Sequence, residues 1–312
     1  MEQLNKETIK VVFFGTHNFA ATILQGLIDS HLFDIQLVIT QPDKPVGRKQ
    51  ELQKSPVKIL AEKYNLSIDQ PVSLKTCTLA HLHTCELGIC AQYGLIIPEN
   101  ILNAPKHGII NVHTSILPKY RGASPIQSAL INGESETGVT LMKMDAGLDT
   151  GPILWQKGLK IEPNDTYTTL EEKLAKIAIL GLTEAVPDYI NHKLSTTIQD
   201  NAKATVCKEL TREDGKIDWC KTALEIYNQY RGLTPWPGVW TMWNDKRLKL
   251  LQIKLADKTL PTGQVLVEDD KIYIGATDGA IEVLELQLEG KQKMTAKSFV
   301  NGYKNLGKAV LS

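Results

Sequence analysis

The sequence predicts an α/β protein that begins with a mainly parallel sheet and ends with a small β-barrel. Up to residue 190, short apolar runs rich in β-branched residues alternate with longer amphipathic segments, which is typical of right-handed βαβ units. From residue 208 onward, closely spaced short strands are separated by turn residues, and this pattern favours a small barrel. A chain of 312 residues is long enough for two such domains.

The elements of the first part can be assigned in chain order. Buried parallel strands, which read as continuous apolar runs, are expected at 9–14, 35–40, 87–91 and 109–113. Helices are expected at 20–29, 56–64, 125–132 and 168–190, the last with a clear amphipathic period. The polar material that follows has no hydrophobic period. We therefore predict a first domain at 1–190, a linker at 191–207 and a second domain at 208–312.

The second part carries a short helix that ends near Tyr230 and then several short strands. These strands are expected at 248–255, 263–267, 271–274 and 280–286. A final helix begins at about Thr295. This order of elements again predicts a small barrel.

Composition limits which ligands the protein can bind and in which compartment it is expected. Lysine and arginine total 35, as do aspartate and glutamate, so any nucleic-acid binding must rely on local patches. No apolar stretch approaches the roughly 20 residues of a membrane span. The five cysteines are odd in number and scattered, which is typical of reduced thiols in a cytoplasmic protein. His81 and His83 lie between Cys77 and Cys90, but without zinc-site spacing, so we expect no metal. A cytoplasmic monomer is the resulting expectation.

One strand ends in a motif that carries chemistry, Ile-Ile-Asn-Val-His-Thr-Ser-Ile-Leu-Pro at 109–118. The two-residue period of a strand puts Asn111 and His113 on the same face. Pro118 has no N–H and disfavours the helical conformation in the residue before it, so the strand ends close to this polar pair. In open α/β sheets, ligands bind at the carboxyl ends of the strands.

The polar pair suits acyl transfer through a tetrahedral intermediate without a covalent enzyme adduct. The Asn111 amide can donate to a developing oxyanion, a contribution of roughly 3 kcal/mol for one well-placed donor. His113 can add a second donor and can carry a proton. A carboxylate beside the imidazole would favour its cationic form, and the glycine-flanked turn Met-Asp-Ala-Gly-Leu-Asp-Thr-Gly at 144–151 offers Asp145 and Asp149. The residues alone do not choose between these two.

Together, these motifs resemble the folate-dependent formyltransferases, and among them the branch that formylates initiator methionyl-tRNA. In this family an Asn-x-His pair is followed by Ser-Leu-Leu-Pro and a later catalytic aspartate. The matching positions are Asn111, His113, Ser115, Ile116, Leu117, Pro118 and Asp149. The resemblance covers nearly the whole chain, with Thr114 where glycine or proline is common. It implies a Rossmann-like formyltransferase domain, an OB-like second domain, and catalysis by Asn111, His113 and Asp149.

The resemblance also implies where the co-substrate 10-formyltetrahydrofolate binds. Ala-Gln-Tyr-Gly-Leu-Ile-Ile-Pro at 91–98 is similar to a turn of the family whose backbone contacts the pterin edge. The folate-binding residues implied in this way are Tyr93, Gly94, Leu95, Ile96, Ser115, Ile116, Leu117 and Pro118. Leu95 and Ile96 would form an apolar wall of the folate pocket.

A basic segment at 40–58 is the candidate for binding tRNA. It contains five basic residues against Asp43 and Glu51, and each Lys or Arg contact to a phosphate displaces counterions. By resemblance this segment binds the acceptor arm of initiator methionyl-tRNA. The residues implied are Lys44, Arg48 and Lys49. Around the catalytic motif, Lys106, Lys119 and Arg121 are expected to add a basic patch.

The function predicted is transfer of a formyl group from 10-formyltetrahydrofolate to the α-amine of initiator methionyl-tRNA, for translation initiation. Two other enzyme functions use the same three residues: a 10-formyltetrahydrofolate hydrolase, in which water replaces the amine, and an amino-sugar nucleotide formyltransferase. Neither of these needs the basic segment at 40–58. A non-enzymatic RNA-binding module would leave the Asn, His and Asp motif unexplained.

Overall fold

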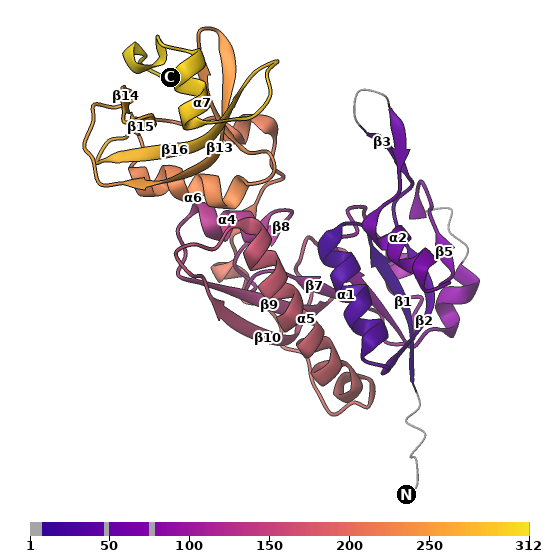
Figure 1. Cartoon of the computed structure of the whole chain (residues 1–312). Helices are drawn as coiled ribbons and strands as arrows, with labels where there is room; N and C mark the ends of the chain where they lie inside the picture. Colours follow the sequence, from indigo (N-terminus) through magenta and orange to yellow (C-terminus); the bar gives the residue numbers. More distant parts are fainter. Residues whose placement is uncertain (1–7, 47–49, 75–78, 312) are drawn as a thin grey trace, which may run out of the picture. The chain divides into compact units, whose positions relative to one another are not determined.

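The computed structural model describes residues 8–46, 50–74 and 79–311 (Figure 1). Contacts between Cα atoms divide the chain into two compact units. The first comprises Met1–Gly122, Thr137–Lys160 and Glu171–Val206. The second comprises Ala123–Glu136, Ile161–Leu170 and Cys207–Ser312. The chain therefore passes between the units more than once.

A seven-stranded sheet forms the centre of the first unit. Its strands are β1 (Ile9–Gly15), β2 (Phe33–Ile39), β5 (Ile68–Asp69), β6 (Leu87–Ala91), β7 (Ile109–His113), β9 (Glu136–Lys143) and β10 (Ile153–Lys160). They lie in the order β10-β9-β7-β6-β1-β2-β5. The pairs β5–β2, β2–β1, β1–β6 and β6–β7 are parallel, whereas β7 and β9 are antiparallel. Parallel strands are buried on both faces, and Phe13 and Phe14 of β1 are fully buried.

The helices of the first unit are α1 (Asn18–Asp29), α2 (Pro56–Lys63), α3 (Glu99–Leu102) and most of α5 (Tyr167–Ile190). Helix α2 begins where expected for its sequence, since the Ser55 side chain accepts from the Lys58 backbone N–H and Pro56 fills the first helical position. A hairpin of β3 (Lys44–Val46) and β4 (Glu51–Gln53) projects from this unit (Figure 1). A short bridge joins β8 (Arg121–Gly122) to β11 (Val206–Cys207).

A six-stranded sheet with helices at its faces forms the second unit. Its strands are β12 (Val239–Trp243), β13 (Lys246–Ala256), β14 (Val265–Glu268), β15 (Lys271–Gly275), β16 (Ala280–Leu288) and β17 (Met294–Thr295). The pairs β12–β13, β13–β16, β16–β15, β15–β14 and β16–β17 are all antiparallel. Its helices are α4 (Pro125–Ile131), α6 (Ala223–Leu233) and α7 (Ala296–Gly302). Helix α4 packs on α6, where Gly232 allows close approach to Leu130 and Ile131.

The predicted fold class is confirmed: a mainly parallel, mixed sheet with helices precedes a smaller domain of antiparallel strands. The strands expected at 9–14, 87–91 and 109–113 and the helix at 168–190 match the structure to within one residue at each end. Strands β9, β10 and β12 were not assigned from the sequence. The domain boundaries at 190 and 208 stay a prediction.

Among the residues described, no helix combines the length and the apolar character needed to cross a membrane.

Candidate active site

The predicted polar pair lies at the carboxyl end of β7. The neighbouring strand β6 runs parallel to β7 and pairs with it through Cys90 and Asn111, so the two carboxyl ends open on the same edge of the sheet. His113 is 5% exposed and Asn111 is half-buried. The amide therefore reaches the edge of the sheet, and the imidazole is held within the protein.

Asp149 reaches this edge from the turn that connects β9 to β10. The carboxylate Oδ1 accepts from Asn111 Nδ2 at 3.3 Å, and Oδ2 lies 3.6 Å from His113 Nδ1. The backbone N–H of Gly122 donates to Oδ2 at 2.8 Å. Gly151 lets the turn close, because a Cβ at that position would lie 1.8 Å from the Lys143 carbonyl oxygen. The structure thus places Asn111, His113 and Asp149 together.

The second aspartate of this turn, Asp145, has a different set of partners. Its Oδ1 accepts from the backbone N–H of Gly147 at 3.0 Å and from the Thr150 hydroxyl at 2.7 Å. Both partners lie within the turn itself, which is how an aspartate stabilises local turn geometry. The structure therefore distinguishes two aspartates that the residues alone left equivalent.

His113 faces an acceptor at each ring nitrogen. The Tyr120 carbonyl oxygen lies 2.9 Å from Nε2, and the Asp149 carboxylate lies on the Nδ1 side. A neutral imidazole has one N–H donor and one acceptor, whereas the imidazolium donates from both nitrogens. The neutral ring can donate to the Tyr120 carbonyl oxygen from Nε2, while Nδ1 lies within ion-pair distance of Asp149 but beyond hydrogen-bond length.

Cys90 is a nucleophile type close to this group, but it is held uncharged. Its side chain is buried, and burial raises the pKa of the thiol to about 12, with the negative charge of Asp149 adding to the increase. The thiolate is the reactive form of cysteine. Near neutral pH this thiol is therefore not a nucleophile.

The residues assigned to folate binding differ in exposure. Tyr93 is 2% exposed, and its carbonyl oxygen accepts from the Thr16 hydroxyl and from Gln41 Nε2. Gly94 follows with φ of +80°, which favours glycine. Leu95 and Ile96 are then 39% and 92% exposed. The turn after β6 thus has a fixed, buried base and presents two apolar side chains to solvent.

The second assigned group follows β7 and is mostly buried. Ser115 and Leu117 are 1% and 2% exposed. The Ser115 hydroxyl donates to the Lys119 carbonyl oxygen at 2.6 Å, and the Leu117 backbone N–H donates to the Thr140 hydroxyl at 3.1 Å. These bonds fix the path of the chain beside the site. Pro118 follows a cis peptide bond, and Ile116 is partly exposed.

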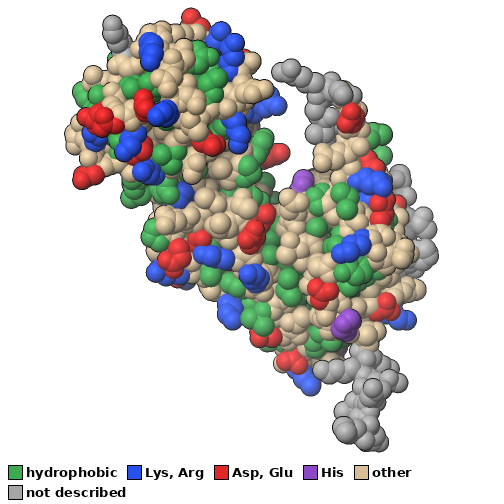
Figure 2. Space-filling view, in the orientation of Figure 1, with side chains coloured by type: hydrophobic (Ala, Val, Ile, Leu, Met, Phe, Trp, Pro, Cys, Tyr) green, Lys and Arg blue, Asp and Glu red, His purple; other side chains and the backbone are tan. Residues whose placement is uncertain are grey.

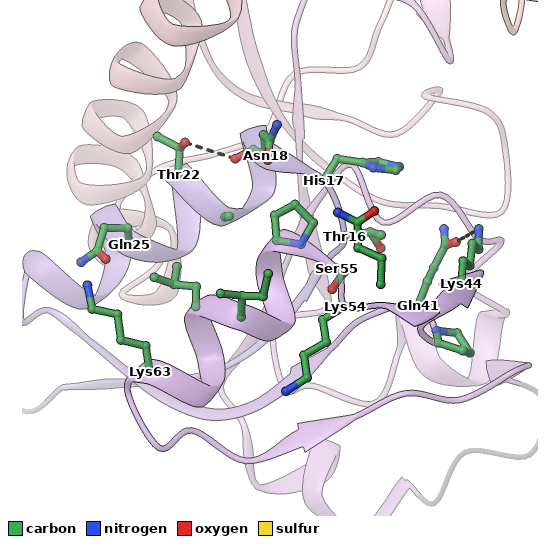
Figure 3. A pocket seen from close by; sticks show the side chains of 16 residues that line it. Thr16, His17, Asn18, Thr22, Gln25, Gln41, Lys44, Lys54, Ser55 and Lys63 are labelled. Carbon is green, nitrogen blue, oxygen red and sulfur yellow. Dashed lines mark hydrogen bonds between the residues drawn. The ribbon is translucent and has the colours of Figure 1, made fainter. Parts of the chain in front are cut away.

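A cavity of about 910 Å³ lies beside the hairpin in the first unit (Figure 3). His17 and Asn18 at the start of α1 line its middle, and Gln41 and Lys44 lie toward one end. Lys44 donates to Gln41 Oε1 at 2.6 Å. Of the residues predicted to bind tRNA, Lys44 lines this cavity, whereas Arg48 and Lys49 lie outside the described residues.

Arg121 does not contribute to the surface patch that the sequence suggested. It is 7% exposed, and its guanidinium donates to the side-chain oxygens of Gln199 and Asn201. Lys106 and Lys119 are both exposed. On the face shown in Figure 2, basic and acidic side chains are intermixed, in keeping with the zero net charge.

Gln199 is the residue near the site that the sequence did not indicate. It lies in the polar segment expected to be a linker, yet it is 6% exposed and bonds the backbone of the Asp149 turn. A single glutamine in a segment without hydrophobic period gives no periodic signal. Only a tertiary contact reveals it.

Comparison with known proteins agrees with this architecture. Residues 9–186 match the family model described as formyl transferase, and residues 209–304 match that of the formyl transferase C-terminal domain. A methionyl-tRNA formyltransferase of Caldicellulosiruptor saccharolyticus is 45% identical over 94% of this chain and 97% of its own length. Another, of Nitrosomonas eutropha, is 40% identical over 95% of each chain.

Among solved structures, an N-formyltransferase from Helicobacter canadensis, crystallised with folinic acid and dTDP-3-aminofucose, superposes with a TM-score of 0.67. It is 23% identical and covers 88% of this chain and 99% of its own, so this likeness concerns the fold. The two family models account for both parts of the chain, and the sequence relatives extend over nearly its full length. The chain belongs to the formyl transferase family.

Proposed function

We propose that this protein transfers the formyl group of 10-formyltetrahydrofolate to the α-amino group of initiator methionyl-tRNA. The observation that carries this proposal is the contact of Asn111 and His113 with the Asp149 carboxylate at the end of β7. The relatives that are 40% to 45% identical over nearly the whole chain are named for this reaction. A transferase that uses folate as co-substrate and needs no covalent enzyme intermediate fits both observations.

In this reaction the amine attacks the formyl carbon, and negative charge develops on the formyl oxygen. The Asn111 Nδ2 atom carries two N–H groups; among the described residues one of them is directed at Asp149, so the other can donate to this oxygen. One such donor contributes about 3 kcal/mol to transition-state stability. The step forms a carbon–nitrogen bond to the amine and breaks the bond between the formyl carbon and the folate nitrogen.

The protons that move in this step indicate the roles of His113 and Asp149. The attacking amine loses a proton, and the departing folate nitrogen gains one. When the substrates are bound, the His113 Nε2–H exchanges the Tyr120 carbonyl oxygen for the oxyanion or the leaving nitrogen, and the proton goes to that nitrogen. The Asp149 carboxylate, beside Nδ1, stabilises the cationic ring and helps relay the amine proton to it. Proton transfer by a positioned side chain contributes about 10²- to 10⁴-fold to a rate.

The turn after β6 fits a flat aromatic substrate such as the pterin of folate. Ile96 is 92% exposed although it is a large apolar residue, and covering it with a ligand removes that surface from water. The turn base is fixed by the bonds to the Tyr93 carbonyl oxygen, so the backbone is already ordered before a ligand arrives. Such preorganisation lowers the entropic cost of binding.

The tRNA is the partner that explains the basic hairpin and its cavity. Lys44, Lys54 and Lys63 line the cavity together with amide and hydroxyl side chains, and this combination suits the phosphates and riboses of a tRNA end. Lys54 is paired with Glu62, and Lys63 lies over the ring of Tyr64, so Lys44 is the lysine we assign to the tRNA. We place this activity in the cytoplasm, carried out by a monomer.

The test follows the fate of the formyl group. The purified full chain is given labelled 10-formyltetrahydrofolate with initiator methionyl-tRNA, uncharged tRNA or a dTDP-amino sugar, and formylated product and free formate are measured in parallel. The expected result is formyl-methionyl-tRNA, with little formate and no product from the other two acceptors. Formate as the main product would instead indicate a hydrolase, and a formylated sugar would indicate the other transferase.

A further inference from the structure

Asp149 has a backbone conformation that its surroundings must maintain. Its φ is 51°, in the left-handed region that favours glycine. In this conformation of the turn the carboxylate meets Asn111 and His113. Groups that hold the backbone on either side of Asp149 therefore set the geometry of the site.

Gln199 binds this backbone with both of its amide hydrogens. Its Nε2 donates to the Asp149 carbonyl oxygen at 2.9 Å and to the Gly151 carbonyl oxygen at 2.7 Å. The amide thereby spans the residues immediately around Thr150. Because Gln199 is 6% exposed, water competes little for these bonds, and an unpaired carbonyl there would be costly.

The orientation of the Gln199 amide is fixed from its other end. Arg121 Nε and one terminal guanidinium nitrogen donate to Gln199 Oε1 at 3.1 and 2.7 Å. The same terminal nitrogen donates to Asn201 Oδ1 at 2.8 Å. A guanidinium has donors and no acceptor, so it admits only the amide orientation that directs Nε2 at the Asp149 turn.

The same segment of the chain also bonds directly to the Asp149 carboxylate. Gly122, the residue after Arg121, donates its backbone N–H to Asp149 Oδ2 at 2.8 Å. The segment of Arg121 and Gly122 thus holds Asp149 twice, directly at the carboxylate and through Gln199 at the carbonyl oxygen. All of these residues belong to the first unit.

We propose that Arg121 and Gln199 are positioning residues that hold the Asp149 carboxylate against Asn111 and His113. This inference rests on the proposed function, because it assigns the two residues a role in that reaction. They do not touch the substrate, so their loss acts on the rate of the chemical step. A displacement of about 1 Å at a reacting group can reduce a rate about 100-fold.

The direct test replaces Gln199 by glutamate. Gln199→Glu keeps the size and the acceptor for Arg121 but removes both N–H donors to the turn. We expect kcat for formyl transfer to fall about 10- to 100-fold, with KM for both substrates within about threefold because uniform binding is retained. Arg121→Lys keeps the charge, loses the planar fork, and is expected to give a smaller fall of the same kind.

The chain offers a matched control in its second unit. Gln229 is 8% exposed, and its Nε2 likewise donates to two backbone carbonyl oxygens, those of Asp214 and Lys216. Gln229→Glu is expected to lower the melting temperature at least as much as Gln199→Glu, because among the described residues no guanidinium faces its side-chain oxygen, while leaving kcat unchanged. An equal loss of kcat in both variants would mean that burial of a charge, and not positioning, is responsible, and would overturn the inference.

A double-mutant cycle shows whether Gln199 acts through Asp149. In an Asp149→Asn background, Gln199→Glu should lower the remaining rate by less than about threefold, because coupled residues are not additive. The inference would be overturned if Gln199→Glu lowered kcat as much in the Asp149→Asn background as in the wild type. It would also be overturned if Gln199→Glu alone had the kcat of the wild type. If the wild type forms formate instead of formyl-methionyl-tRNA, the proposed function fails, and the same cycle on formate release still tests the positioning role.

Discussion

Two polar regions of the first unit differ in nearly every physical property. At the end of β7, the Asp149 carboxylate contacts both Asn111 and His113, and the three side chains are buried or half-buried. Beside the hairpin, the cavity lined by Lys44 and its neighbours is open, and several of its side chains are long and exposed. The first region holds a few atoms in fixed positions, and the second offers a wide surface of donors and charge.

The difference follows from what each region is proposed to do. Stabilising an oxyanion requires donors that are already in place, since reorganisation during the reaction would cost the energy gained. Binding a polyanion requires net positive charge near phosphates, and long lysine side chains achieve this without fixed geometry. Substitutions in the first region should therefore reduce kcat, whereas those in the second should raise KM with a dependence on salt.

Asp149→Asn should have the largest effect, because it removes the carboxylate charge from the group at the end of β7. We expect kcat to fall about 10²- to 10⁴-fold, because the ring of His113 loses its anionic partner, while the amide oxygen can still accept from Gly122. Single-turnover rates measure this fall. Asp145→Asn, in the same turn, is the control: its partners are local, so its rate should stay within about threefold of the wild type. Similar losses in both variants would mean that turn stability accounts for the result.

Ile96→Ser tests whether folate covers the exposed side chain of Ile96. Ile96 is 92% exposed, so its replacement should leave the melting temperature unchanged. If a ligand covers it, about half of the burial energy of an isoleucine is lost and KM for folate rises about tenfold. Val72→Ser is the control, at a residue 87% exposed elsewhere in the same unit. An unchanged folate KM in Ile96→Ser would remove this residue from the proposed pocket.

Lys44→Ala tests the second region. We expect KM for tRNA to rise about three- to tenfold at moderate salt, and the slope of log affinity against log salt to fall by about 0.7 to 0.9, the value for one phosphate contact. Folate KM and kcat should stay the same. Lys157→Ala, an exposed lysine of β10, serves as a charge control. A loss of equal size from both lysines would indicate net charge and not a contact at Lys44.

Cys90→Ala should have the smallest effect. Because burial raises the pKa of this thiol to about 12, the neutral form predominates at every pH below that value, and no thiolate is present to act near pH 8. We expect rates within about threefold of the wild type, since removing a small buried side chain mainly affects stability. Alkylation at pH 8 followed by mass spectrometry should label the exposed Cys220 and spare Cys90 until the protein is denatured. Rapid labelling of native Cys90 would contradict its burial.

The sequence predicted best what depends on local pattern. Strands β1, β6 and β7 are largely apolar and mostly buried, so their positions followed from the sequence alone. Strands β9 and β10 were missed. Strand β9 begins with Glu136, Thr137 and Gly138, which are weak strand formers or polar, and Lys157 and Gly158 interrupt the strand pattern of β10. The helix predicted at 125–132 exists as α4, but its packing on α6 in the second unit is a tertiary contact.

The candidate site shows the same limit. Asn111 and His113 share a face because of the strand period, whereas the choice of Asp149 over Asp145 required the resemblance at the sequence level and hydrogen bonds at the structural level. Arg121 looked like a surface charge and is buried in a network. Gln199 carried no signal, since its part depends on contacts with residues about 50 and 80 positions away.

Single-turnover formyl transfer by Asn111→Ala, with both substrates saturating, is the most direct test of whether the reaction takes place at the end of β7. We predict that formyl-methionyl-tRNA forms about 10²- to 10³-fold more slowly than with the wild type, as expected for loss of one oxyanion donor, and that the affinities for folate and tRNA are unchanged. Asn103→Ala, an exposed asparagine at the end of α3, should behave as the wild type. A rate for Asn111→Ala equal to that of the wild type would contradict the assignment of the reaction to the end of β7.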